Sequence, residues 1–151
     1  MAPEIYSVRV DDYDEIVSVW EESVRYSHHF LSPPDILFYK EAIRNDLLPR
    51  SDVICSRDHR GKITGFAAVR ESKLEMLFII PARMGTGLGK RLLKYAADKM
   101  GARCLDVNED NQRAVNFYLG QGCRLLARSP RDGAGRPYPL LHLEIAASVQ
   151  A

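Results

Sequence analysis

Three glycines at alternate positions, Gly85, Gly87 and Gly89, form the part of this chain whose residue types most clearly suggest chemistry. The segment 84–90 follows the apolar run 77–80 and precedes the amphipathic run 91–97, so it joins a predicted strand to the start of a predicted helix. Glycine lets backbone N–H groups approach a ligand closely, and a helix start adds unpaired N–H groups and the positive end of the helix dipole. The expected ligand is therefore a phosphate or a pyrophosphate.

Two better-known phosphate motifs do not fit this turn. A P-loop requires glycine, four residues, and then Gly-Lys-Ser/Thr, whereas here the first position is Met84 and the last is Arg91. A dinucleotide fingerprint requires a third glycine where Lys90 stands, and it usually lies early in a long doubly wound domain. Only a short C-terminal remainder follows this turn, so the sequence matches neither motif.

The N-terminal part of the chain is predicted to form a strand and two helices. Residues 5–10 alternate like a strand, and apolar residues at helical spacing follow the acidic turn at 11–12. Pro34 and Asp35 suit the start of a second helix, which Pro49 ends. These two helices are expected to form one layer over the rest of the fold.

The remaining segments predict a mixed sheet. The expected strands are 52–56, 63–69, 74–80, 102–107, 123–127 and 138–145, and a helix is expected over 111–119. The strand, helix and strand around the glycine turn predict a parallel pair, while the hairpins pair antiparallel. The expected fold is a single α/β (α+β) domain over residues 1–151: a mostly antiparallel central sheet of about six to seven strands, flanked by about four helices, with the parallel pair at the ligand site.

Length and charge limit the class of protein. The 151 residues suit one ordinary domain, and 21 Lys and Arg against 20 Asp and Glu leave a formal net charge of +1. That balance gives no basic excess for nonspecific binding to nucleic acid. No apolar stretch approaches the ~20 residues of a membrane span, and the first residues lack a signal-peptide pattern. We therefore expect a cytoplasmic protein that binds neither nucleic acid nor membranes.

Cysteine and histidine positions do not suggest a metal site. Cys55, Cys104 and Cys123 are odd in number, lack metal-ligand spacing and lie in apolar surroundings, which fits buried side chains in a reducing compartment. His59 and His142 do not form a ligand pattern. We expect no bound metal.

The segment 77–123 resembles the GCN5-related N-acetyltransferase (GNAT) family in two motifs. In that family a strand and an Arg/Gln-x-x-Gly-x-Gly/Ala turn bind the pyrophosphate of acetyl-coenzyme A, and residues 84–89 match this turn apart from Met84 in its first position. Residues 107–123 are similar to the family's Asn…Ala…Phe-Tyr…Gly-Phe signature. The patterns near both ends resemble small bacterial members, so the resemblance covers nearly the whole chain.

The resemblance implies an acetyl-coenzyme A-dependent N-acetyltransferase, an acyltransferase in which a primary amine attacks the thioester directly in a ternary complex. Backbone groups of 77–79 would lie along the pantetheine arm, with one N–H polarising the thioester carbonyl, and 85–90 would wrap the pyrophosphate. The implied cofactor-binding residues are Leu77, Phe78, Ile79, Met84, Gly85, Thr86, Gly87, Leu88, Gly89, Lys90, Asn111 and Tyr118.

Proton transfer is assigned to a tyrosine and a carboxylate. Tyr118 matches the family tyrosine that protonates or hydrogen-bonds the departing sulfur. A protonated alkylamine has a pKa near ~10, so a carboxylate or a water chain must accept its proton at neutral pH. Glu75 and Asp106 are the main candidates, because related family members place acidic residues on these two central strands, with Glu109 as a third. The sequence does not choose between them.

The acceptor side is defined least. His28 and His29 follow the first helix, where the family forms its acceptor-binding wall, so an imidazole there could touch the substrate. The acceptor could be a protein lysine, a protein N-terminus or a small-molecule amine, and the chain could be a monomer or a homodimer.

Met84 keeps a second function open. A thioether cannot donate a hydrogen bond where the family usually has Arg or Gln, so Arg83, Lys90 or Arg91 would have to hold the phosphates instead. The alternative to an enzyme is therefore a non-catalytic module that binds or senses acyl-coenzyme A.

Overall fold

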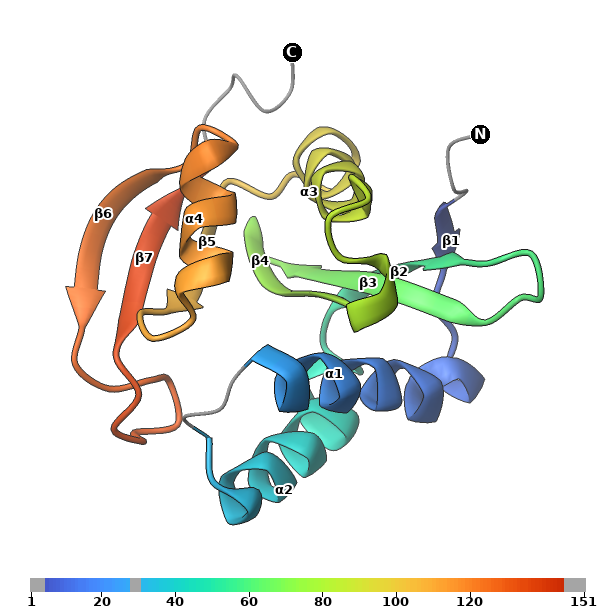
Figure 1. Cartoon of the computed structure of the whole chain (residues 1–151), viewed down its shortest axis with the longest axis horizontal. Coiled ribbons are helices and arrows are strands. Elements are labelled where there is room, and N and C mark those ends of the chain that lie inside the picture. Colours follow the sequence, from blue (N-terminus) through green and yellow to red (C-terminus); the bar gives the residue numbers. More distant parts are fainter. Residues whose placement is uncertain (1–4, 28–30, 146–151) are drawn as a thin grey trace.

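The computed structural model describes residues 5–27 and 31–145, which form a seven-stranded sheet with helices on both faces (Figure 1). In chain order the elements are β1 (Ile5–Ser7), α1 (Tyr13–Ser27), α2 (Pro33–Ala42), β2 (Asp52–Arg57), β3 (Ile63–Arg70), β4 (Lys73–Ile79), α3 (Leu88–Lys99), β5 (Cys104–Asn108), α4 (Gln112–Gly120), β6 (Arg124–Ser129) and β7 (Leu140–Glu144). The strand order is β1-β2-β3-β4-β5-β7-β6, and β4 with β5 is the one parallel pair in this sheet. The predicted mixed, mostly antiparallel sheet is confirmed.

The parallel pair holds together over a very short stretch. Lys73 pairs with Cys104 and Leu74 with Leu105, and beyond these residues β4 and β5 diverge (Figure 1). Along the same stretch β4 keeps its pairing with β3 on its other side as far as Ile79. The edge of β4 that faces β5 is therefore left without a partner strand after Leu74.

A bulge in β4 coincides with this divergence. Ala68 of β3 pairs with Met76, but the next residue, Val69, pairs with Leu74, so Glu75 is the extra residue of β4. A bulge of this kind bends a strand and changes the direction of a side chain. It accounts locally for the way in which β4 leaves β5.

Two apolar clusters hold the helices against the two faces of the sheet. On one face α3 packs Leu92 and Leu93 against the fully buried Leu105 and Leu143. On the other face α1 and α2 cover β2, β3 and β4, with Trp20 in the second cluster. The apolar stripe predicted for the first helix is thus its buried face.

The first strand is shorter than the predicted segment 5–10. β1 ends at Ser7, and Val10–Asp12 form a 3-10 turn that leads directly into α1. The side chain of Asp12 accepts a hydrogen bond from the backbone N–H of Arg9 at 3.0 Å, and this local bond competes with extended structure. The alternation in the sequence did not reveal it.

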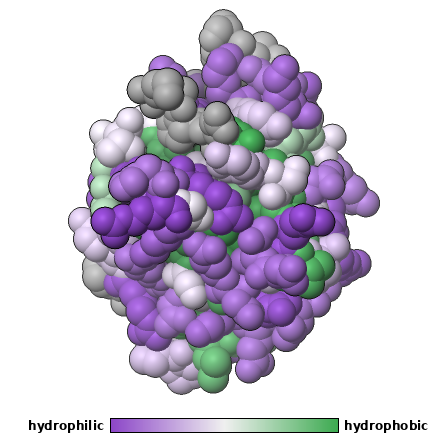
Figure 2. Space-filling model, turned by 90° about the vertical axis from the view of Figure 1, so that its right-hand side faces the viewer, coloured by the Kyte–Doolittle hydropathy of each residue, from purple (hydrophilic) through white to green (hydrophobic). Residues whose placement is uncertain are grey.

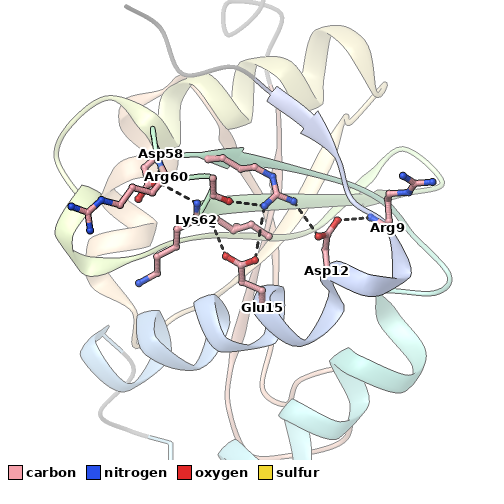
Figure 3. Close-up of polar contacts among 9 residues, drawn as sticks. Arg9, Asp12, Glu15, Asp58, Arg60 and Lys62 are labelled. Atoms are coloured by element: carbon pink, nitrogen blue, oxygen red, sulfur yellow. Dashed lines mark hydrogen bonds and ion pairs between the residues drawn. The ribbon is translucent and has the colours of Figure 1, made fainter.

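A polar network ties the start of α1 to the β2–β3 hairpin (Figure 3). The Arg57 guanidinium lies 3.1 Å from Asp12 Oδ1, and the Glu15 carboxylate accepts a hydrogen bond from the backbone N–H of Ile63 at 2.7 Å. The backbone N–H of Arg9, followed by the Arg57 guanidinium, holds the pKa of Asp12 below its ordinary value. The side of the molecule that carries β1 and this hairpin is largely hydrophilic (Figure 2).

The second helical segment contains one wide turn. α2 passes into the π-helical turn Ile43–Leu47, in which the Leu48 N–H donates to the Ile43 carbonyl at 3.0 Å. Helical structure therefore continues almost to Pro49, as predicted. In the described part of the chain, no helix combines the length and apolar character that crossing a membrane requires.

The cysteines differ in burial. Cys55 and Cys123 are buried, but Cys104 is partly exposed at the end of β5, where its thiol contacts the Ser72 carbonyl. The expectation that all three are buried is wrong for Cys104, because its side chain lies on the face of β5 opposite the buried Leu105. All three are free thiols.

Candidate active site

The glycine turn forms a cradle of unpaired backbone N–H groups. Gly85 and Gly87 have φ values of +77° and +89°, a left-handed conformation that strongly favours glycine, and α3 begins directly after Gly87. Within the described residues, the backbone N–H groups from Gly85 to Lys90 have no acceptor, and the first that does, Arg91, donates to the Gly87 carbonyl. The cradle can therefore receive an anion without losing any internal hydrogen bond.

Gly89 allows a close approach between three elements. A Cβ atom at this position would lie 3.1 Å from Ile79 Cδ1 of β4 and 3.3 Å from Phe117 Cζ of α4. The first turn of α3 thus sits tightly against β4 and α4. The third glycine of the motif serves packing, whereas the first two serve backbone conformation.

A cavity of about 360 Å³ extends from the cradle to the unpaired edge of β4. Its lining comes from α1, β4, the glycine turn, α3 and α4, and consists of Ser23, Ser27, Leu77, Phe78, Ile79, Met84, Gly85, Gly87, Gly89, Lys90, Asn111, Arg113, Ala114, Phe117, Tyr118 and Gln121. An elongated ligand with amide groups could hydrogen-bond to the open strand edge while its phosphates occupy the cradle.

Most of the residues predicted to bind the cofactor lie around this cavity, and two do not. The Thr86 hydroxyl donates to the Arg83 carbonyl at 2.6 Å on the surface. The Leu88 side chain is buried in the apolar core beside α3. These two residues can contribute only backbone groups to the cradle.

A second, smaller cavity of about 80 Å³ lies between β4 and β5. Five of its lining residues also line the larger cavity: Leu77, Phe78, Asn111, Ala114 and Tyr118. Glu75, Asp106 and Asn108 belong to the smaller cavity alone, and none of its described lining residues is a lysine, arginine or histidine. The two cavities therefore share one wall. The larger cavity is also lined by Lys90 and Arg113, and the smaller one by Glu75 and Asp106.

Tyr118 and Asn111 stand on this shared wall. Burial, and then the neighbouring Cys123, raise the pKa of Tyr118 well above its ordinary value, so the hydroxyl stays protonated at neutral pH. Within the described part of the chain this hydroxyl has no hydrogen-bond partner. Asn111 caps α4, because its Oδ1 accepts a hydrogen bond from the Ala114 N–H at 3.2 Å. The predicted spacing of seven residues does bring both side chains to one site.

The two candidate bases differ in their partners. Asp106 is occupied, since its Oδ2 lies 2.7 Å from Lys73 Nζ and its Oδ1 lies 2.6 Å from His142 Nδ1. Burial alone would raise the pKa of Asp106, but the hydrogen bonds and charges of Lys73 and His142 outweigh it and the pKa is lowered. Glu75, on the β4 bulge, has neither a hydrogen bond nor an ion pair with any described residue. Glu75 is thus the carboxylate that is available to accept a proton.

Six residues that line the larger cavity were not predicted to bind the cofactor: Ser23, Ser27, Arg113, Ala114, Phe117 and Gln121. Arg113 lies in the first turn of α4, two residues after Asn111, and that position was an available signal. Ser23 and Ser27 are small polar residues spaced four apart on α1, and Ser23 interrupts its buried apolar stripe. Of the cations considered in place of Met84, Lys90 lines the cavity, whereas Arg83 and Arg91 do not. The predicted acceptor residues His28 and His29 lie outside the described residues.

Comparison with known proteins supports one family. The profile of the acetyltransferase (GNAT) family matches residues 11–122. The peptidyl-lysine N-acetyltransferase YjaB of Escherichia coli is 33% identical over 135 residues, which cover 89% of this chain and 91% of YjaB. The solution structure of apo-YjaB from Escherichia coli superimposes with a TM-score of 0.86 at 32% identity, covering 97% and 99% of the two chains.

A more distant solved structure shares the fold. The PaiA N-acetyltransferase of Thermoplasma acidophilum, determined in complex with coenzyme A, has a TM-score of 0.72 at 19% identity. The match covers 95% of this chain and 99% of that protein.

Proposed function

The chain belongs to the acetyltransferase (GNAT) family and is an acetyl-coenzyme A-dependent N-acetyltransferase, and we propose that its acceptor is the side-chain amine of lysine residues in proteins. The observation that carries the acceptor assignment is the smaller cavity, which meets the larger one at Tyr118 and whose described lining residues include two carboxylates and no cation. Such a cavity suits the ammonium end of a lysine chain. The similarity to YjaB, a peptidyl-lysine N-acetyltransferase, supports the same choice.

The larger cavity is the proposed cofactor site. The N–H groups from Gly85 to Lys90 would bind the pyrophosphate, and the Lys90 and Arg113 side chains would supply positive charge to the phosphates. The open edge of β4 would hydrogen-bond to the pantetheine arm. A backbone N–H from 77–79 would polarise the thioester carbonyl. The residues of this chain fit coenzyme A, because an anion cradle and an unpaired strand edge share one cavity.

The proposed chemistry is direct attack in a ternary complex. Bound acetyl-coenzyme A would supply the acetyl group: its C–S bond would break as the acceptor nitrogen forms a C–N bond with the acetyl carbon, and the thiolate would be the leaving group. Glu75 accepts the proton from the attacking nitrogen, because it lines the acceptor cavity and has no hydrogen bond or ion pair in the described structure. The Tyr118 hydroxyl, kept protonated by burial, donates a hydrogen bond to the departing sulfur.

The alternative of a non-catalytic sensor of acyl-coenzyme A is not favoured. A sensor requires the larger cavity alone, and it has no use for carboxylates in a second cavity that opens at the same tyrosine. The family match and the similarity to YjaB also favour an enzyme.

Release of coenzyme A from acetyl-coenzyme A, followed by mass spectrometry of the acceptor, tests the proposal. One peptide carries a lysine and a blocked N-terminus, a matched peptide carries arginine in place of that lysine with a free N-terminus, and spermidine represents small amines. We expect acetylation of the lysine peptide at a rate at least tenfold above that of the other two. Preferred acetylation of the free N-terminus or of spermidine would refute lysine as the acceptor.

Two further assignments accompany this function. We propose a cytoplasmic location, which the three free thiols support because such groups persist in a reducing compartment. A monomer or a homodimer is proposed as the assembly, with no nucleic acid partner, in keeping with the net charge of +1. Light scattering after size-exclusion chromatography measures the oligomeric state, and a gel-shift assay tests for binding of nucleic acid.

A further inference from the structure

A chain of three hydrogen-bonded side chains crosses β5, β7 and β6 behind the smaller cavity. Asp106 Oδ1 lies 2.6 Å from His142 Nδ1, and His142 Nε2 lies 2.6 Å from Ser129 Oγ. The sheet register produces this chain, because Asp106 is directly opposite His142 and Ser129 is opposite Leu140, two residues before His142 on β7. None of these contacts serves the core, which lies on the other face of these strands.

The donor is defined at the Asp106 end of this chain. Asp106 is ionised, so it can only accept, and His142 Nδ1–H must donate to it. His142 Nε2 pairs with Ser129 Oγ, a hydroxyl that can both donate and accept a hydrogen bond. Ser129 therefore orients the imidazole, and the imidazole orients the carboxylate.

Lys73 holds the Asp106 oxygen that His142 does not contact. Its ammonium group binds Oδ2 at 2.7 Å while His142 binds Oδ1, so donors on β4 and β7 hold the two oxygens. Each carboxylate oxygen has two lone pairs, which leaves Asp106 able to accept further hydrogen bonds from a group in the cavity that it lines. The carboxylate is thus held in one orientation without being saturated.

The charges around the smaller cavity favour a cation. Glu75 and Asp106 contribute two negative charges to its wall, and Lys73, which is outside the lining, contributes one positive charge. Glu75, Asp106 and Lys73 together carry a net charge of one negative. A carboxylate whose position is set in advance binds an ammonium group without the cost of ordering its own side chain.

We propose that Asp106 binds the ammonium group of the acceptor, and that His142 and Ser129 are the residues that position Asp106 for this purpose. Glu75 then remains the proton acceptor, so the two carboxylates of one cavity divide binding and proton transfer between them. This inference rests on the proposed function, and it assigns separate roles to residues of the same acceptor site.

Steady-state kinetics with the lysine peptide separate the two roles. Asp106→Asn is expected to raise the KM for the peptide about tenfold, with kcat reduced less than threefold and the KM for acetyl-coenzyme A unchanged. Glu75→Gln is expected to lower kcat at least tenfold with little change in the KM for the peptide. If Asp106→Asn instead lowers kcat and leaves the peptide KM unchanged, Asp106 is the base and the proposal is wrong.

Variants of His142 test positioning. His142→Ala removes the donor to Asp106 and is expected to raise the peptide KM three- to tenfold, whereas His142→Asn keeps an uncharged N–H donor and is expected to stay within twofold of wild type. Ser129→Ala should raise the KM about twofold. Glu144→Gln is the matched control on the same face of β7, and no change is expected. Equal KM values for His142→Ala and wild type would exclude the positioning role.

Direct measurement of acceptor binding tests the role of Asp106 without relying on turnover. Calorimetry of Nα-acetyl-lysine amide with the protein saturated in coenzyme A is expected to give a Kd about tenfold higher for Asp106→Asn than for wild type. Equal Kd values, or no binding to wild type, would overturn the inference. Titration with coenzyme A alone reports on the cofactor site, so a failure of the family function is distinguished from a failure of the acceptor assignment.

Discussion

Tyr39 of α2 donates a hydrogen bond to Asp132, 93 residues later, in the loop between β6 and β7. A second hydrogen bond joins the same two elements, because Tyr138 of that loop donates to Asp35 of α2. Arg136 adds an ion pair with Asp35 at 3.0 Å, and its guanidinium lies 4.1 Å from the centre of the Phe38 ring. These contacts connect the N-terminal helical layer to the far end of the sheet, beyond the point where β4 and β5 diverge (Figure 1).

Tyr39→Phe is expected to lower the free energy of unfolding by about 1 kcal/mol through loss of this hydrogen bond. Burial, followed by the Asp132 carboxylate, raises the pKa of Tyr39, so the hydroxyl is protonated in the folded state throughout neutral and mildly alkaline pH. A raised pKa contributes stability that is fully present below the ordinary tyrosine value near ~10 and is lost as the pH rises through the folded value. Urea unfolding should therefore give the same difference at pH 7 and pH 9. Tyr26→Phe, at a tyrosine that is 52% exposed, is the control and should unfold like wild type.

Tyr118→Phe is expected to lower kcat roughly ten- to a hundredfold, because the departing sulfur loses its hydrogen-bond donor. The Kd for acetyl-coenzyme A should stay within twofold, since the ring that lines both cavities is retained. Because the pKa of Tyr118 is raised, ionisation of this residue should cause no loss of wild-type activity below pH ~10. Tyr95→Phe, on α3 outside both cavities, is the control. Undiminished turnover by Tyr118→Phe would remove Tyr118 from the mechanism.

Met84→Gln should strengthen binding of coenzyme A about three- to tenfold. Met84 lines the cofactor cavity beside the N–H cradle, and glutamine adds a side-chain donor that a thioether lacks. Met84→Leu is the control, because it preserves the apolar character without a donor and should bind as wild type does. Calorimetric titration with coenzyme A measures both, and weaker binding by Met84→Gln would show that the thioether is required at this position.

Lys90→Gln and Arg113→Gln are each expected to weaken coenzyme A binding about three- to tenfold. Both side chains line the larger cavity, and within the described structure neither has an ion-pair partner to lose. Raising the salt concentration to 0.5 M should weaken the binding of wild type more than that of either variant, since salt screens the charges that the variants lack. Lys99→Gln, near the other end of α3, should change nothing. If Lys99→Gln weakens coenzyme A binding as much as Lys90→Gln does, the net charge of the protein, and not local contact with the phosphates, governs affinity.

The features that the sequence predicted well depend on neighbours in the chain. The glycine turn needs left-handed backbone at Gly85 and Gly87, and glycine is the residue that adopts it most readily. The parallel pairing of β4 and β5 follows from the strand, helix and strand order around that turn. Asn111 and Tyr118 share a site because they are spaced by two helical turns on one element.

Other features depend on strands that are distant in the chain. The bulge at Glu75 exists only in the register between β3 and β4, which alternation along β4 does not reveal. The Arg113 side chain reaches the cofactor cavity because α4 lies against the opening between β4 and β5. The shortened β1 has a different cause, because it follows from a local hydrogen bond between Arg9 and Asp12 that the alternating strand pattern did not indicate.

By itself, the sequence indicated the fold family and the anion cradle, because both depend on local spacing and residue type, and its resemblance to the GNAT family named Glu75 and Asp106 as candidate bases. Only the tertiary structure decided how Glu75 and Asp106 differ. Lys73 and His142 approach Asp106 from neighbouring strands, 33 and 36 residues away in the chain, whereas Glu75 has no hydrogen bond or ion pair among the described residues. The identity of a residue sets which protons it can carry, but its neighbours across the sheet determine whether it is free to carry them.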